Sequence, residues 1–137
     1  MDVARVGQAR TYRVDGVTAN VLLAWGTFDS RNLLVTWMVI SPDGRQPGHS
    51  HPGSEQVYIV VSGTARLQVR EERELVSAGA LVYVPPGAPH AVANAGAEEL
   101  VVITAASPPF PVERYFAEPE GRQIRVRPVG ELEGLRG

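Results

Sequence analysis

The chain has 137 residues, 44% of them hydrophobic, which is enough for one core but too few for two ordinary domains. It contains no cysteine, so disulfides and thiolate chemistry are excluded, and all 13 basic residues are arginine, which excludes a lysine base. The net charge of −2 and the lack of a basic stripe argue against nucleic-acid binding. No apolar run approaches the roughly 18 residues that a membrane span needs, so we expect a single cytoplasmic domain covering 1–137.

Short apolar runs bounded by Gly, Pro, Asn, Asp or Ser follow one another along the chain and predict strands. The expected strands, in chain order, are 17–25, 33–40, 57–61, 65–70, 81–84, 90–92, 100–105 and 123–129. Pro or Gly interrupts nearly every window of helical length, so helix is expected to be minor. The pattern predicts an all-β sandwich or barrel with a core at about 17–106, followed by a returning segment and tail at 107–137.

All three histidines lie in two turn-rich segments, PGHSHPGSEQ and PPGAPH. Residues i and i+2 of an extended segment face the same side, so His49 and His51 can direct two imidazoles to one point. A lone H-x-H pair is more often two surface histidines in a loop. The surrounding residues therefore have to decide whether His49, His51 and His90 form a metal site.

These segments resemble the two motifs of the cupin superfamily, and the chain is similar to its small single-domain microbial members. The second motif, G-x5-P-x-G-x2-H-x3-N, runs from Gly79 to Asn94, and H-x-H-x4-Q-x6-G from His49 to Gly63 resembles the first. The resemblance implies a double-stranded β-helix, also called a jelly roll, made of two antiparallel sheets. It also implies one divalent metal ion inside the barrel, bound by the three histidines.

The chain departs from the family at the fourth ligand. Seven positions before Gly63, where the family has Glu, this chain has Gln56, and Glu55 precedes it. Neighbouring residues of a strand face opposite ways, and the register set by Gly63 turns Gln56 inward with Tyr58 and Glu55 outward. The spacing from His51 instead selects Glu55, which a bulge at 53–54 would turn inward. We favour Gln56 and keep Glu55 as the alternative.

Three neutral imidazoles and one amide leave the charge of a divalent ion uncompensated, so we expect a small anionic or oxygen-rich substrate. Nitrogen and oxygen donors suit Mn, Fe, Co, Ni, Cu or Zn without selecting one. The resemblance permits dioxygenase, decarboxylase, lyase or isomerase chemistry. A dioxygenase-like enzyme is favoured because, apart from Tyr58 as a catalytic candidate, few residues remain for proton transfer. The alternative is a non-catalytic sensor or storage protein for a small molecule.

The aromatic residues on expected strands, Trp25, Trp37, Tyr58 and Tyr83, are expected to be mainly core residues. The strand at 57–61 is apolar on both faces, although one face of a barrel normally meets water. Either a second copy of the chain, giving a homodimer, or a terminal segment of the same chain is expected to cover it. The charged run 70–74 is expected to be a solvated hairpin turn.

Overall fold

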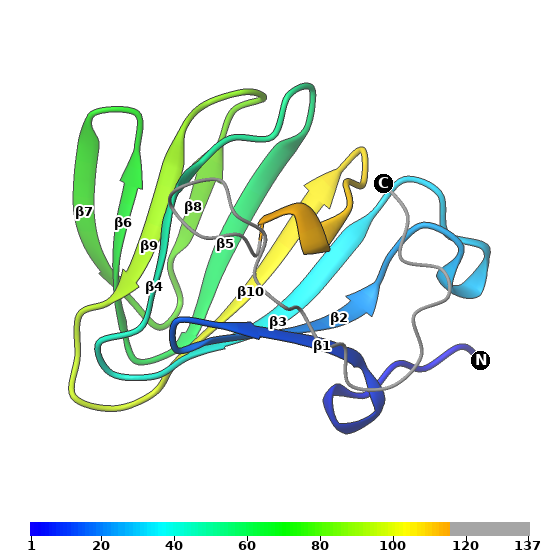
Figure 1. Ribbon diagram of the computed structural model, residues 1–137, viewed down its shortest axis with the longest axis horizontal. Coiled ribbons are helices and arrows are strands. Elements are labelled where there is room, and N and C mark those ends of the chain that lie inside the picture. Colours follow the sequence, from blue (N-terminus) through cyan, green and yellow to red (C-terminus); the bar gives the residue numbers. More distant parts are fainter. Residues whose placement is uncertain (116–137) are drawn as a thin grey trace.

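The structure, a computed structural model, describes residues 1–115 and contains two antiparallel sheets, as expected (Figure 1). One sheet has the strand order β1 (Arg10–Val14), β2 (Val17–Leu23), β3 (Leu34–Ile40), β10 (Leu100–Ser107), β5 (Glu55–Ser62) and β8 (Leu81–Val84). The other has the order β4 (Arg45–His49), β9 (His90–Asn94), β6 (Thr64–Val69) and β7 (Glu72–Ser77). Three 3₁₀ turns complete the described chain: η1 (Val6–Gln8), η2 (Thr27–Asp29) and η3 (Val112–Tyr115).

The strands form because apolar residues alternate with a period of two, and β3 and β10 show this most clearly. Every second residue of these two strands is buried between the sheets, and the others are half-buried on the outer face. On both strands the inward series is interrupted by a threonine, and Thr36 and Thr104 are register partners. The middle of the six-stranded sheet therefore presents hydroxyl groups to the interior.

The buried side chains form two clusters rather than one continuous core. The first lies between the two sheets and includes Met38, Tyr58 and Leu100. The second covers the inner side of β1 and β2 and includes Tyr12 and, from η3 near the end of the described chain, Val112. On β3, Met38 belongs to the first cluster and Leu34 to the second, with Thr36 between them. The gap between the clusters is the place where a polar site can form.

The expected strands up to residue 105 are present, with each boundary within two residues of the expected one, whereas the strand expected at 123–129 lies outside the described residues. Three strands were missed. β1 pairs with β2 and extends the sheet beyond the expected core, and β4 carries the first histidine. The charged run 70–74 is a turn only at Arg70 and Glu71, because β7 begins at Glu72 and pairs with β6.

Two of the aromatic residues expected in the core are exposed. Trp25 follows β2 and is 41% exposed, with the Arg31 guanidinium 5.7 Å from the centre of its ring. Tyr83 lies on the outer face of β8 and is 48% exposed. Both predictions were wrong because burial of an aromatic on a strand depends on which face the strand packs, which its own sequence does not reveal.

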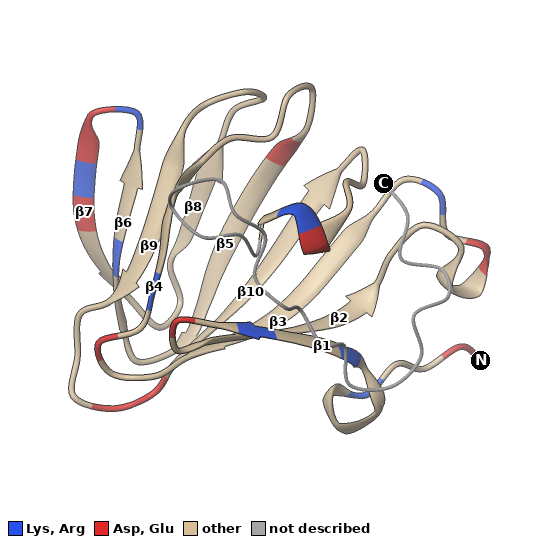
Figure 2. Ribbon diagram, in the orientation of Figure 1, with Lys and Arg blue, Asp and Glu red and all other residues tan. Residues whose placement is uncertain are grey.

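The charged residues lie mainly in loops, on β7 and near strand ends (Figure 2). β2, β3, β8 and β10 carry no charged residue, and β5 carries only Glu55. No helix in the part of the chain that the structure describes is long and apolar enough to cross a lipid bilayer.

Candidate metal centre

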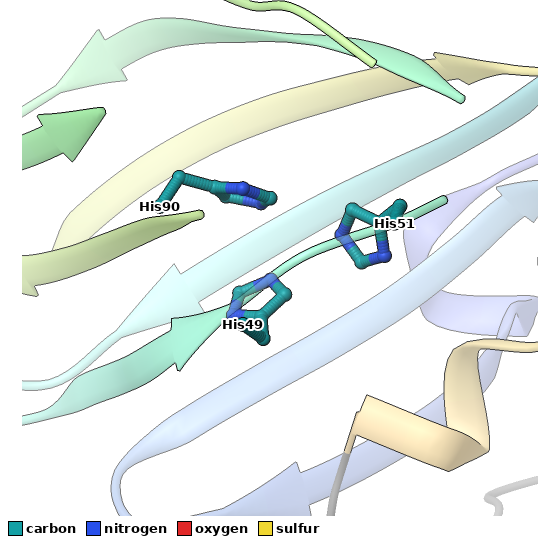
Figure 3. Close-up of side chains that lie close together, drawn as sticks. All are labelled: His49, His51 and His90. Atoms are coloured by element: carbon teal, nitrogen blue, oxygen red, sulfur yellow. The ribbon is translucent and has the colours of Figure 1, made fainter. Parts of the chain in front are cut away.

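The three histidines converge at one end of the four-stranded sheet (Figure 3). His49 is the last residue of β4, His90 is the first residue of β9, and these two residues are register partners. His51 follows two positions later, in the loop before β5. The three ring centres lie 4.3 to 5.0 Å apart, and one nitrogen from each ring lies within 4.8 Å of the others. The predicted convergence is therefore present.

The local backbone orients two of the rings. The Nδ1 of His49 is 2.8 Å from the carbonyl oxygen of Pro47, and the Nδ1 of His90 is 2.9 Å from that of Ala88. A carbonyl oxygen only accepts, so in each neutral ring Nδ1 carries the hydrogen and Nε2 keeps its lone pair. The Nε2 of His90 is buried without a hydrogen-bond partner in the described part of the chain. Both rings are thus in the tautomer that leaves Nε2 available to bind a metal ion.

The environment keeps all three imidazoles neutral. Burial, followed by repulsion from His90, lowers the pKa of His49 to about 4. Burial and then the charges of His49 and His90 lower the pKa of His51 to about 3, although the nearby Gln56 side chain opposes this effect. Burial also lowers the pKa of His90. A metal ion at this point would not compete with protons at neutral pH.

Gln56 and Glu55 occupy opposite faces of β5, in the orientation that the register of Gly63 predicts. Gln56 is 6% exposed and faces inward, and its Oε1 has no hydrogen-bond partner among the described residues. Glu55 is exposed on the outer face, where its Oε1 accepts a hydrogen bond of 2.7 Å from the Tyr83 hydroxyl. The unpartnered Gln56 oxygen adds a donor of the type that a divalent ion prefers.

A small cavity with a volume of about 30 Å³, which opens to solvent, adjoins His49, His51 and Gln56. It occupies the gap between the two buried clusters, with Thr36 and Thr104 in its wall. The other lining residues are Ala19, Leu34, Met38, Gln46, Phe110, Val112 and Tyr115. None of the lining residues that the structure describes is Asp, Glu, Lys or Arg.

Three of these lining residues come from the chain after β10 and were missed by the sequence reasoning. The run from Ser107 to Pro111 predicted only the end of the barrel, and nothing in its spacing marks Phe110 or Tyr115 as site residues. In the structure, the Phe110 ring stacks on His51 with centres 3.8 Å apart and planes 10° apart. The Tyr115 ring meets His51 edge-on at 4.2 Å.

Tyr58, the expected catalytic candidate, lies beneath the histidines rather than in the cavity wall. It is fully buried, its ring centre is 5.9 Å from that of His90, and burial raises the pKa of its hydroxyl. The hydroxyl donates a 3.5 Å hydrogen bond to the Oε1 of Gln46, and Gln46 lines the cavity. Tyr58 thus reaches the cavity only through Gln46, and its catalytic role stays a prediction.

Comparison with known proteins places these features in a family. Residues 36–106 match the family model described as the cupin domain, and this range contains all three histidines and Gln56. An uncharacterized protein of Methanocaldococcus jannaschii is 31% identical over 62 residues, which are 45% of this chain and 50% of that protein. The chain thus spans half of the length of this relative.

Solved structures share the fold at low sequence identity. A Thermotoga maritima protein described as a predicted oxalate decarboxylase is 19% identical with a TM-score of 0.70, over 77% of this chain and 97% of that chain. A Bacillus subtilis oxalate decarboxylase, studied for its Mn(II) centres, is 23% identical with a TM-score of 0.63, over 68% of this chain and 26% of that chain.

Proposed function

Because this chain belongs to the cupin domain family, we propose that it is a metal-dependent enzyme, dioxygenase-like, acting on a small anionic or oxygen-rich molecule. The convergence of the three imidazoles carries the proposal. Their ligand nitrogens lie within 4.8 Å of one another, and buried polar atoms of His51, His90 and Gln56 have no hydrogen-bond partner in the described chain. A bound ion would satisfy these atoms, whose burial otherwise costs free energy.

His49, His51, His90 and Gln56 would hold a divalent ion of Mn, Fe, Co, Ni, Cu or Zn. Such an ion supplies Lewis-acid or redox chemistry at its open coordination positions. The Mn(II) centres of the similar oxalate decarboxylase make manganese a natural first ion to test. The carbonyls of Pro47 and Ala88 would fix the orientation of two of the ligand rings, because each accepts the hydrogen of the ring nitrogen that does not face the ion.

The cavity supports a substrate with one anionic group and an apolar remainder. Neither the four proposed ligands nor the lining residues described by the structure include a carboxylate, so the ion would keep its full positive charge. No arginine lines the cavity in the described chain, which leaves the ion as the single attraction for an anion. Leu34, Met38 and Val112 would contact the apolar part of the substrate, and Thr36 and Thr104 could hydrogen-bond to it.

A non-catalytic sensor or storage role is the second candidate. It is favoured by one observation: apart from the proposed ligands, the described lining residues offer only the Tyr115 hydroxyl as an acid or base, and burial raises its pKa. An oxygenase has the least need for such groups, so the same observation ranks oxygenase chemistry first among the enzymatic alternatives. Oxygen consumption with loss of a small carboxylic acid supports the enzyme, whereas tight binding without turnover supports the sensor.

Elemental analysis of the protein purified without an affinity tag, followed by reloading with each ion, tests the centre. We expect one ion per chain in the wild type and none in His90→Ala. Persistent absence of metal from the wild type would overturn the proposed function. Oxygen-electrode assays with the loaded protein and a panel of small carboxylic acids then test the reaction.

Gln56 and Glu55 provide a matched pair of variants for the fourth ligand. We expect Gln56→Glu to bind metal at least tenfold more tightly, because a carboxylate cancels half of the charge of the ion. Glu55→Gln makes the opposite exchange, of a carboxylate for an amide, on the outer face of β5. The metal affinity of this variant should equal that of the wild type. Unchanged affinity in Gln56→Glu would count against Gln56 as a ligand.

A further inference from the structure

His51 differs from the other two histidines in the way its ring is held. His49 and His90 each have a backbone carbonyl against Nδ1, whereas in the described chain neither nitrogen of His51 has a partner with full hydrogen-bond geometry, and the polar group that interacts with it is the Gln56 side chain. His51 also lies in a loop beyond the end of β4, where its backbone is held not by strand pairing but by its carbonyl oxygen, which accepts hydrogen bonds from the N–H groups of Ser54 and Gly87. These bonds leave the side-chain torsions free, and the residue is only 3% exposed, so packing against its neighbours fixes the orientation of the ring.

That restraint is an aromatic corner supplied by the chain after β10. Phe110 covers one face of the His51 ring, nearly parallel at 3.8 Å, and Tyr115 contacts it edge-on at 4.2 Å. The two aromatic rings also contact each other edge-to-face at 5.1 Å. A ring stacked against a parallel neighbour resists tilting out of its plane, so the stack restricts the directions in which the His51 nitrogens can point.

The segment that carries Phe110 is itself tied to the His51 loop. The Ser54 hydroxyl, 4% exposed, donates a 2.7 Å hydrogen bond to the carbonyl oxygen of Pro108. Val112, two residues after Phe110, is anchored in the buried cluster over β1 and β2. The segment that carries Phe110 is therefore fixed both before and after this residue, and the stack is not a loose surface contact.

We propose that Phe110 is a positioning residue for the metal ligand His51, so that the segment 107–115 is a functional part of the metal centre. This inference rests on the proposed function, because it assumes that His51 binds a metal ion. Phe110 takes the place that a hydrogen-bonding carbonyl has for His49 and His90. Removal of such supporting partners in metal sites typically lowers affinity by roughly 10- to 100-fold.

Cobalt(II) titration of the full chain, followed by visible absorption, tests the proposal without requiring a substrate. We expect Phe110→Leu, which keeps apolar bulk but removes the ring, to bind Co(II) roughly tenfold more weakly and with an altered spectrum. Phe110→Tyr keeps the stacked ring and should have the Co(II) affinity and the spectrum of the wild type. The matched control is Val21→Ala, which loosens the same buried cluster at a residue that does not line the cavity and should leave affinity and spectrum unchanged.

Two outcomes would overturn the positioning role: wild-type affinity and spectrum in Phe110→Leu, or an equal loss in Val21→Ala. Failure of the wild type to bind any metal would instead contradict the proposed function. A measurement on the metal-free wild type keeps the inference testable even if Phe110→Leu does not fold. The stacked Phe110 ring should shift the imidazole CH signals of His51 upfield in NMR spectra, and unshifted His51 signals would contradict the stack.

Discussion

At the scale of single residues, the side-chain environment determines what each histidine can do. Burial lowers the pKa of His49, His51 and His90, and neutral imidazoles are suited to bind a metal ion rather than to act as general acids at neutral pH. The same burial makes the metal-free site a source of instability, because three imidazoles lack the water that they would contact in the unfolded chain.

This situation predicts that metal-free protein loses stability as the pH falls from 7 to 5. The unfolded histidines bind protons near their usual pKa of about 6.5, whereas folded His49 and His51 do so only near 4 and 3. Between these pKa values the unfolded state binds more protons than the folded state, so the free energy of unfolding decreases as the pH is lowered. The fall is up to about 1.4 kcal/mol per pH unit for each histidine.

Urea unfolding at pH 7, 6 and 5 in the presence of a chelator measures this dependence. Measurements stop at pH 5 so that the titration of carboxylates contributes little. The control is His51→Gln, which removes one of the proton acceptors and should flatten the profile. A wild-type profile that is level over this range would show that the three rings are solvated and protonated in the folded state.

At the scale of elements, turns with positive φ place the strands that carry the ligands. Gly63 has a φ of +88° between β5 and β6, and Gly87 has a φ of +76° in the turn that leads to His90. Gly87 lies in a segment that the sequence marks as turn-rich, and Gly63 ends the first motif. They differ in their surroundings: a Cβ at Gly63 would lie 2.8 Å from the carbonyl oxygen of Glu99, whereas a Cβ at Gly87 would meet nothing within 4 Å.

We therefore expect Gly63→Ala to destabilise the fold more than Gly87→Ala. The left-handed conformation alone costs an L residue about 1 to 2 kcal/mol, and this is the whole effect expected for Gly87→Ala. Gly63→Ala adds a steric clash with backbone that cannot move freely. Urea unfolding of both variants measures the difference, and equal losses would mean that the turn after β5 relaxes at no cost.

At the scale of the whole molecule, the outer face of the six-stranded sheet is apolar over several adjacent strands. Ile103 on β10 pairs with Trp37 on β3 and with Ile59 on β5, and Ile59 pairs with Leu81 on β8, so four apolar side chains form one row. Leu81 is 57% exposed. Broad apolar faces of this kind commonly mark association sites.

The expected homodimer remains a prediction, and this face is the surface that it would use. Light scattering should give a mass of twice 14.8 kDa for the wild type and a lower mass for Leu81→Glu. Leu75→Glu is the control, because Leu75 is 58% exposed but lies on β7 of the other sheet. A wild-type mass equal to one chain would exclude the dimer and leave a terminal segment of the same chain as the alternative cover.

The sequence by itself determined the all-β class, because two-residue alternation and frequent turn residues specify strands locally. The barrel and the set of three histidines came from the resemblance of two segments, His49 to Gly63 and Gly79 to Asn94, to the cupin motifs. The sequence also favoured an inward Gln56, since neighbouring residues of a strand face opposite ways, and it kept Glu55 as the alternative. β1 and β4 were missed because polar or Pro- and Gly-containing segments become strands only when a partner offers its edge.

Only the tertiary structure decided what surrounds the ligands. Phe110 is 59 residues from His51 in the sequence, and their stacking depends on the path of the chain after β10, for which no periodicity or motif exists. The exposure of Trp25 and Tyr83 likewise depends on which sheet face receives a covering layer. Local patterns therefore identify the candidate ligands, whereas non-local packing determines how their side chains are held.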